Sequence, residues 1–293
     1  MSAHDALSRR QFVAITAASA TSLKAQSRKK VPVGLQLGAV DKDMQKDPTG
    51  TLRAVAKMGY TLVEFPTEPY MNWTESQLKE CRTVMDSVKL RCRSTRGEIV
   101  SFTGDGLAKT IALNHILGAD TLVSVRGPQP TGGTGRGGRG PGAKPVTLDS
   151  WKGYFDTMHS AAEKLRANKM VLGFHNHDVE FKELEGKRPI DLLAANKDFV
   201  AYHLNLAWCI RGGADPVKDF VQVVAGKVQS IQCQDWEGKA KWKELFAAAE
   251  GPGKIQFYLI QRASNGLALV AREGNDMMDF AQKDLEYFKQ LHG

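Results

Sequence analysis

Short apolar runs alternate with longer amphipathic runs along most of the chain, and this alternation limits the possible folds more than any other feature. The apolar runs predict strands at residues 33–37, 61–65, 90–95, 120–126, 169–176, 199–205, 227–233 and 254–261. The amphipathic runs predict helices at residues 49–58, 75–87, 106–117, 148–168, 189–195, 216–224, 242–250 and 276–291. Alternation of this kind is typical of α/β proteins with a parallel sheet.

The number of units favours a closed sheet. Eight strand and helix units in about 260 residues match the usual size of a (β/α)8 TIM barrel. An open doubly wound sheet would need a glycine fingerprint directly after the first strand, and residues 36–40 contain none. We therefore predict an α/β fold, a TIM barrel formed as a single domain by residues 31–293, with no nucleotide cofactor.

Polar side chains lie at the ends of the predicted strands. In a TIM barrel the carboxyl ends of all strands meet at one mouth, and this mouth carries the active site. The residues at these ends are Glu64, Arg96, Arg126, His175, His177, Asn205, Gln232 and Gln261. The sequence therefore predicts that they converge on one polar site.

The stretch 170–178 contains the most informative of these strand ends. An apolar run is followed there by His175, Asn176, His177 and Asp178. Because side chains alternate along a strand, His175 and His177 face the same side. Two imidazoles on one face suggest a functional site. The alternative is that one histidine caps the strand end through a backbone hydrogen bond while the other is solvated.

Two other residues near the mouth each have two possible roles. Glu64 is either an acid, base or hydroxyl acceptor, or the partner of Arg96 in a salt bridge. Trp208 follows the sixth predicted strand, and it either stacks on a sugar face or only packs on the barrel rim.

The N-terminus has the pattern of an export signal. Residues 8–13, which contain Arg9 and Arg10, resemble the twin-arginine motif and precede a weakly apolar run at residues 12–23. That run is too short to span a bilayer. We therefore expect residues 1–30 to be a twin-arginine signal with a short linker, read by the twin-arginine export machinery of a bacterium. The mature protein would be periplasmic or extracytoplasmic. The alternative is an accidental Arg-Arg pair before a disordered tail.

The positive charge of the chain lies outside the predicted barrel. Of the net charge of +8, residues 1–30 carry +5 and the glycine-rich segment 126–145 carries +4, which leaves −1 for the rest. A nucleic-acid-binding protein normally carries its positive charge on a folded face, so we expect no nucleic-acid partner. The segment 126–145 itself is either a mobile lid for an anionic substrate or a disordered insertion.

The four cysteines show no metal-binding spacing. Cys81, Cys92, Cys209 and Cys233 form no C-x-x-C pair, so they do not predict a zinc site. A domain of this size needs no disulfide for stability, and we expect free thiols.

Five motifs, taken in order, resemble the sugar phosphate isomerase/epimerase family, whose xylose isomerase-like barrel is shared by the type 2 apurinic endonucleases. In chain order they are Gly34-Leu-Gln-Leu37, Gly59-Tyr-Thr-Leu-Val-Glu-Phe65, Phe174-His-Asn-His-Asp178, Asn205-Leu-Ala-Trp208 with Arg211-Gly-Gly-Ala-Asp-Pro216, and Ile231-Gln-Cys-Gln-Asp235. The resemblance extends over nearly all of residues 31–293, and its strength lies in the order and spacing of the motifs.

The resemblance implies a divalent metal, Mn, Mg or Zn, held by four ligands on the last four strands. Carried over one position at a time, these ligands fall on His175, Asn205, Gln232 and Ile260, and Arg96 stands where a histidine is common. Three of the four positions thus lack the carboxylate or imidazole that such a cation requires. We therefore expect a degraded metal site. The alternative is a shifted site made by His175, His177 and Glu64.

The resemblance also implies a function, an isomerase or epimerase that acts by proton transfer on a sugar, keto-sugar or sugar phosphate at the barrel mouth. The expected catalytic residues are Glu64, His175 and His177. The expected residues for a small carbohydrate ligand are Arg96, Asn205, Trp208, Arg211, Gln232, Gln234 and Asp235. The alternative is a non-catalytic carbohydrate-binding or accessory protein on the same fold.

Overall fold

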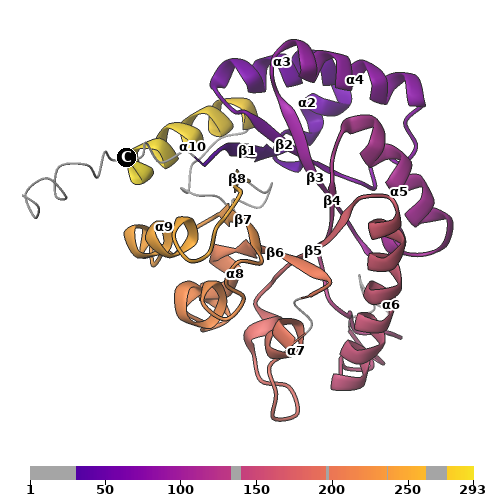
Figure 1. The fold of residues 1–293 in the computed structure, drawn as a ribbon, viewed down its shortest axis with the longest axis vertical. Coiled ribbons are helices and arrows are strands. Elements are labelled where there is room, and N and C mark those ends of the chain that lie inside the picture. The colour runs from indigo at the N-terminus through magenta and orange to yellow at the C-terminus, as the bar shows by residue number, and fades with distance from the viewer. Residues whose placement is uncertain (1–30, 133–139, 196–197, 236, 262–275) are drawn as a thin grey trace, which may run out of the picture. The chain divides into compact units, whose positions relative to one another are not determined.

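The computed structural model describes residues 31–132, 140–195, 198–235, 237–261 and 276–293. Residues 31–293 form one compact unit, a single-domain (β/α)8 TIM barrel (Figure 1). Eight parallel strands close in chain order, and β8 pairs with β1. The strands are β1 (Val33–Gln36), β2 (Leu62–Pro66), β3 (Arg91–Gly97), β4 (Thr121–Ser124), β5 (Val171–His175), β6 (Val200–Asn205), β7 (Val228–Cys233) and β8 (Phe257–Ile260). The predicted fold class is confirmed.

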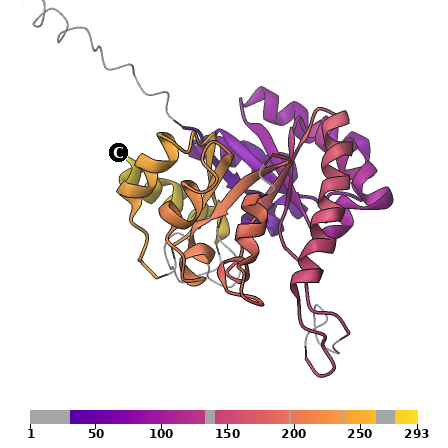
Figure 2. The ribbon, with the colours of Figure 1, turned by 60° about the horizontal axis from the view of Figure 1, so that its bottom comes forward.

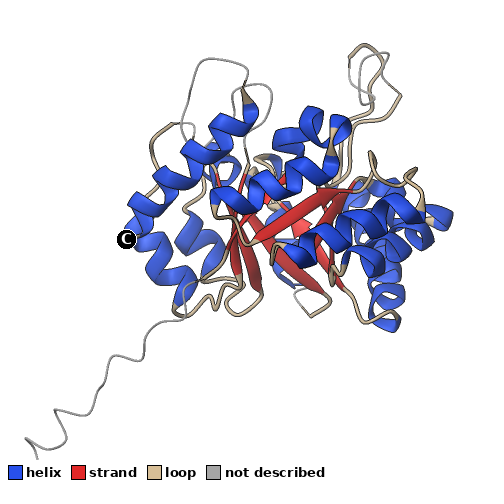
Figure 3. Ribbon diagram, turned by 90° about the horizontal axis from the view of Figure 1, so that it is seen from above, coloured by secondary structure: helices blue, strands red, loops and turns tan. Residues whose placement is uncertain are grey.

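Helices surround these strands on the outside of the barrel (Figure 3). They are α3 (Pro48–Met58), α4 (Glu75–Ser87), α5 (Gly104–Leu117), α6 (Leu148–Ala167), α7 (Pro189–Ala195), the π-helix η5 (Pro216–Val221), α9 (Trp242–Glu250) and α10 (Met277–His292). Shorter pieces were not predicted from the sequence: α2 (Asp41–Lys46), α8 (Leu206–Arg211), and the 3-10 turns η1 (Leu37–Val40), η2 (Ile99–Phe102) and η4 (Val179–Phe181). No helix among the described residues is long and apolar enough to cross a membrane.

Local sequence signals explain where the helices begin and end. Thr74 and Gln77 form a capping box at the start of α4, in which each side chain accepts the other's backbone N–H. The helix α3 begins at Pro48 under a cap from the Asp47 side chain and ends at Gly59, which adopts a φ of 105° that favours glycine.

The two faces of the sheet differ in chemistry. Side chains such as Phe65, Phe174 and Tyr258 point outward and pack in the main core beneath the helices. Inside the barrel, Leu62, Phe257 and Leu259 form a separate apolar cluster. Other inward side chains are polar and buried, namely Glu64, Ser94, His203 and Ser230. TIM barrels more often fill this interior with branched apolar residues, so the polar interior of this chain departs from the usual pattern.

The cysteine prediction is confirmed, because Cys81, Cys92, Cys209 and Cys233 are free and buried. Residues 133–139 of the glycine-rich segment lie outside the described residues. The two flanks of this segment extend past the end of α6 (Figure 2), and Thr131 and Lys144 pair as an antiparallel bridge. The bridge closes the base of the segment at the mouth end of β4. The expected signal at residues 1–30 also lies outside the described residues.

Candidate functional site

A polar cavity of about 370 Å³ lies at the carboxyl ends of the strands. Its lining residues are Gln36, Gly38, Pro66, Glu68, Arg96, Glu98, Val125, Arg126, His175, His177, Asn205, Trp208, Gln232, Gln234 and Gln261. The strand-end residues that the sequence singled out therefore meet at one place, with the exception of Glu64.

Glu64 forms a buried ion pair with Arg96, which lines this cavity. One carboxylate oxygen of Glu64 accepts a hydrogen bond from Arg96 Nε, and the other accepts one from Ser94 Oγ at 2.6 Å. The Glu64 side chain is fully excluded from solvent, whereas Arg96 also lines the cavity. The sequence left two roles open for Glu64, and the one observed is the salt bridge to Arg96. Both carboxylate oxygens have partners within the barrel.

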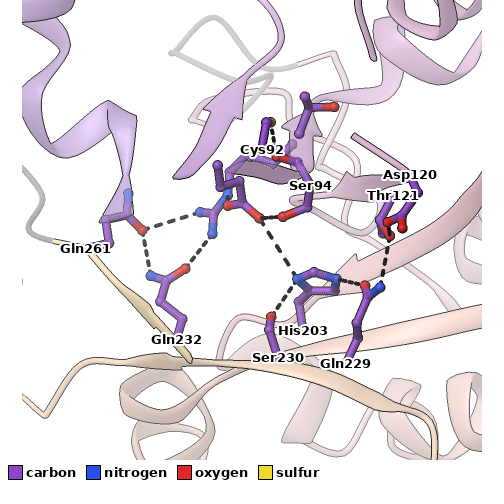
Figure 4. Close-up of polar contacts among 12 residues, drawn as sticks. Cys92, Ser94, Asp120, Thr121, His203, Gln229, Ser230, Gln232 and Gln261 are labelled. Carbon is purple, nitrogen blue, oxygen red and sulfur yellow. Dashed lines mark hydrogen bonds and ion pairs between the residues drawn. The ribbon is translucent and has the colours of Figure 1, made fainter. Parts of the chain in front are cut away.

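The guanidinium of Arg96 also contacts the last two strands. It donates from Nη2 to Gln232 Oε1 and from Nη1 to Gln261 Oε1, and Gln232 Nε2 donates to the same Gln261 oxygen (Figure 4). Asn205 Nδ2 donates to Gln234 Oε1 at 2.8 Å, and Gln234 Nε2 donates to the backbone oxygen of Gln261 at 3.1 Å. The floor of the cavity is therefore a linked set of amides around one cation.

His203 lies below this set, inside the barrel. Its Nδ1 is 2.7 Å from Ser230 Oγ, and its Nε2 is 2.7 Å from Gln229 Oε1 (Figure 4). Burial lowers the pKa of His203 to about 4, so the imidazole is neutral at neutral pH. The sequence analysis missed this residue, because a strand that is buried on both faces gives no alternating pattern to mark its inward positions.

His175, the last residue of β5, and His177, two residues after the strand ends, lie side by side at the mouth. Their ring centroids are 5.3 Å apart, and His177 is also 5.3 Å from the Trp208 ring. Burial, and next the charge of Arg96, hold the pKa of His175 well below its usual range. Its Nδ1 has no hydrogen-bond partner among the described residues, and the same holds for Gln36 Oε1. Both residues are almost fully buried and line the cavity.

Glu180 supports the histidine turn, and the sequence analysis missed it. Its Oε2 accepts the backbone N–H of His177 at 2.7 Å, and its side chain is fully buried. Burial raises the pKa of Glu180 to about 7. The available signal was a lone acid between Val179 and Phe181, where an apolar setting predicts a buried carboxyl group.

Two charged rim residues at the mouth, Glu68 and Glu98, were also missed as lining residues. Glu98 forms an ion pair with Arg126 at 3.0 Å, and Glu68 Oε1 accepts the backbone N–H of Glu98 at 2.6 Å. The pKa of Glu98 is raised, chiefly because the carboxyl group is partly buried. The charge of Arg126 lowers this pKa, and the charge of Glu68 raises it further. These charged groups give the rim the capacity to bind hydroxyl groups of a ligand.

Two predicted substrate-binding residues do not line the cavity. The Arg211 guanidinium lies over the Trp208 ring, 5.3 Å from the ring centroid. The Asp235 carboxylate accepts the backbone N–H groups of Lys239 at 3.0 Å and Ala240 at 3.1 Å. Both residues therefore order the rim, because their charged groups are engaged by neighbouring parts of the chain.

The fourth metal-ligand position needs a correction. Ile260 points outward and packs in the main core with Tyr258, whereas Phe257 and Leu259 point into the barrel. Because side chains alternate along a strand, the next inward residue is Gln261, which lines the cavity. The residue that faces the cavity at the end of β8 is thus Gln261 and not Ile260.

The residues at the four positions that the resemblance implies, with Gln261 in place of Ile260, do not fit a tightly held divalent cation. They provide one imidazole, His175, and three neutral amides, Asn205, Gln232 and Gln261, and the guanidinium of Arg96 lies against two of these amides. A hard cation prefers anionic oxygens and is repelled by a fixed positive charge.

Among the described residues, no three His, Cys, Asp or Glu side chains are grouped to hold a metal. The shifted site of His175, His177 and Glu64 is therefore not formed.

The fold and this mouth together define a (β/α)8 TIM barrel with a polar cavity at the carboxyl ends of its strands. No protein-family model matches the sequence. No curated protein matches it either. Solved structures that it resembles include a sugar phosphate isomerase/epimerase from Parabacteroides distasonis, with 19% identity, a TM-score of 0.68 and coverage of 90% of this chain and 96% of that chain.

Two other similar structures are sugar epimerases. A D-psicose 3-epimerase with D-tagatose from Clostridium cellulolyticum is 11% identical, with a TM-score of 0.65 and coverage of 89% and 99% of the two chains. A 3-keto-D-glucoside 4-epimerase from E. coli is 12% identical, with a TM-score of 0.62 and coverage of 89% and 100%. At these identities the similarity establishes the fold that the chain shares with sugar isomerases and epimerases.

Proposed function

We propose that this protein is a sugar isomerase or epimerase-like protein that binds a small sugar or keto-sugar at the barrel mouth and transfers a proton there without a resident metal. The observation that carries the proposal is the pair of buried polar atoms at the cavity, His175 Nδ1 and Gln36 Oε1, that have no hydrogen-bond partner within the described part of the chain. A buried polar atom without a hydrogen bond is costly, and a ligand rich in hydroxyl groups would supply the missing partners.

The remaining chemistry of the cavity supports the same ligand class. Trp208 provides an aromatic face beside His177, and aromatic faces pack well against the apolar face of a sugar ring. The amides of Asn205, Gln232 and Gln234 add donors and acceptors that suit hydroxyl groups. His177 is the proton-transfer group in this proposal, because its imidazole is partly exposed at the mouth.

Binding and hydrogen exchange test the two parts of this proposal. Calorimetry with a panel of ketoses and aldoses should find at least one ligand, and incubation in D2O should place deuterium on a carbon next to its carbonyl group. His177→Gln should lower the exchange rate about 100-fold or more. The matched control His159→Gln, on the outer helix α6, should leave the rate unchanged. Failure of every sugar to bind overturns the proposal.

A second candidate is a non-catalytic carbohydrate-binding or accessory protein. The neutral amides at three inherited ligand positions favour it, because they bind hydroxyl groups without supplying charge for catalysis. Sugar binding without deuterium exchange would establish this candidate in place of the first.

Export is part of the proposal. The Arg9-Arg10 pair and the apolar run after it support delivery of the folded protein outside the cytoplasm by the twin-arginine machinery.

A further inference from the structure

We propose that the guanidinium of Arg96 is the electrophile of this site, which binds the carbonyl oxygen of the sugar and stabilises the negative charge that develops there during proton transfer. This inference rests on the proposed function and deepens it. Arg96 would then do the electrostatic work for which the family resemblance implies a divalent cation, at the same mouth.

The first argument is the hydrogen-bond capacity of Arg96. A guanidinium group has five N–H donors in a fixed plane. Within the described residues, three of these donors are used: Nε donates to Glu64, Nη2 to Gln232 and Nη1 to Gln261. One N–H on each terminal nitrogen remains for a ligand, and Arg96 is 8% exposed where it lines the cavity. Two donors on one group match the two lone pairs of a carbonyl oxygen.

The second argument is the direction of the charge. The carboxylate of Glu64 lies inside the barrel and is fully buried, whereas the guanidinium of Arg96 lies at the cavity floor. The pair is therefore a fixed dipole with its positive end toward the ligand. The position of the guanidinium is set by three strands, so little reorganisation is needed when charge develops on the ligand. The charge of Arg96 also helps to keep His175 neutral, after the larger effect of burial.

The third argument is that the amides on β7 and β8 accept from Arg96 with their side-chain oxygens. Gln232 and Gln261 turn Oε1 toward the guanidinium, which is the orientation that these groups would take toward a metal ion. A cation therefore already occupies the centre of this set of oxygens. It is a permanent part of the chain, because an arginine side chain does not lose its proton in proteins.

The proposed step is balanced within the site. The bond between hydrogen and the carbon next to the carbonyl breaks, and its proton passes to the imidazole of His177. The electron pair forms a carbon–carbon double bond, and the carbonyl oxygen takes the negative charge beside Arg96. An isomer forms when the proton returns to the former carbonyl carbon while the hydroxyl proton of the neighbouring carbon passes to the oxygen beside Arg96, so that the neighbouring carbon becomes the new carbonyl. An epimer forms when a proton returns to the opposite face of the carbon that lost it.

The test uses the double variant Arg96→Ala/Glu64→Gln, because a single change would leave a buried charge without its partner. With the sugar that binds best in calorimetry, the double variant should exchange deuterium about 100-fold more slowly, while its Kd changes less than about tenfold. Added guanidinium ion at millimolar concentration should restore part of the rate by filling the space of the deleted side chain. EDTA should not change the rate of the unaltered protein.

A matched control removes an ion pair from the other end of the same strand. Arg93 and Asp120 form a pair at 2.9 Å, and Arg93→Ala/Asp120→Asn should keep the full exchange rate. An unchanged rate in Arg96→Ala/Glu64→Gln, with its fold confirmed by circular dichroism, would overturn the role of Arg96 and leave the proposed function standing. The role of Arg96 would also be overturned if EDTA abolished the exchange activity of the unaltered protein and Mn²⁺ restored it. No exchange in the unaltered protein would instead remove the proposed function, and this inference with it.

Discussion

The carboxylate of Glu64 and the guanidinium of Arg96, on neighbouring strands β2 and β3, form an ion pair inside the barrel with the Glu64 side chain fully excluded from solvent. Burial of two charges is costly unless each gains further hydrogen bonds. Ser94 Oγ supplies one for Glu64, and two glutamine side chains supply others for Arg96. The pair therefore depends on the network around it.

This dependence predicts strongly coupled mutations. Glu64→Gln alone should lower the free energy of unfolding by about 3–5 kcal/mol, because it leaves the guanidinium buried without a counter-charge. Adding Arg96→Met should recover a large part of that loss, since both charges are then gone. Urea titrations of the two single variants and the double variant measure the coupling. Additive losses in the double variant would show that the two charges do not interact.

Trp208 should contribute to ligand affinity more than to stability. Its ring contacts His177 and Arg211 at the rim, and it is only partly buried. Trp208→Ala should weaken sugar binding about tenfold, which corresponds to about 1.4 kcal/mol, and Trp208→Phe should recover part of the loss. Calorimetry measures the affinity and a thermal melt measures the stability. Unchanged affinity in Trp208→Ala would mean that the ring only packs the rim.

The pH dependence of stability should reveal Glu180. Its pKa is raised from 4.5 to about 7 by burial, so the folded state binds more protons than the unfolded chain between these values. The stabilising contribution of Glu180 is therefore present at low pH and is lost as pH rises through 7. His203 acts in the opposite sense: its pKa is lowered from 6.5 to about 4, and its contribution is lost as pH falls through 4.

The variant Glu180→Gln separates these two effects. From pH 4.5 to 7.5, its free energy of unfolding should rise by about 3 kcal/mol relative to that of the unaltered protein. Urea titrations at several pH values measure this difference, and the exposed control Glu183→Gln should show none. A constant difference between Glu180→Gln and the unaltered protein across this range would contradict a raised pKa.

The glycine-rich segment should contribute little to stability. Its base is closed by the bridge between Thr131 and Lys144. Replacing residues 132–142 with a four-residue Gly-Ser linker should change Tm by less than about 3 °C, because closure entropy varies slowly with loop length. Differential scanning calorimetry measures the change. A much larger fall in Tm would show that the segment packs on the barrel.

Export should depend on the paired arginines. Changing both Arg9 and Arg10 to Lys keeps the charge but removes the motif, and the protein should then remain in the cytoplasm. Cell fractionation of a bacterial host that produces the full chain measures its location. Normal export of the double variant would refute the twin-arginine assignment.

The sequence predicted the barrel well because its signals are long and repeated. The strand end at His175 and His177 was placed correctly, since a buried run of β5 stops where polar residues begin. The rim helix α8 was not predicted, because it has only six residues and begins directly after β6, with Asn205 as its cap. A helix of this length lacks the periodic pattern that identifies longer helices.

The errors at the site have a common physical cause. Residues 257–260 are all apolar and all buried, so their sequence carries no alternation that tells the inward face from the outward one. The sequence analysis therefore assigned the cavity-facing position to Ile260, one residue before Gln261. The register of such a strand is set by its partners in the barrel, which the sequence of the strand does not show. The contacts of Glu64 and His203 come from neighbouring strands whose residues are 26 to 32 positions away along the chain, and local sequence patterns do not reveal them.

The network that joins Arg96 to Gln232 spans 136 positions of the chain, and this separation constrains how the protein can change over generations. Anionic ligands on β7 or β8 would bind Arg96 before they could bind a metal, and loss of Arg96 alone would leave Glu64 with a buried, uncompensated charge. A lineage with this barrel can therefore acquire a metal site only through a destabilised intermediate or through paired substitutions. The cost of removing the arginine alone therefore follows from the buried pair itself and does not depend on the reaction at the mouth.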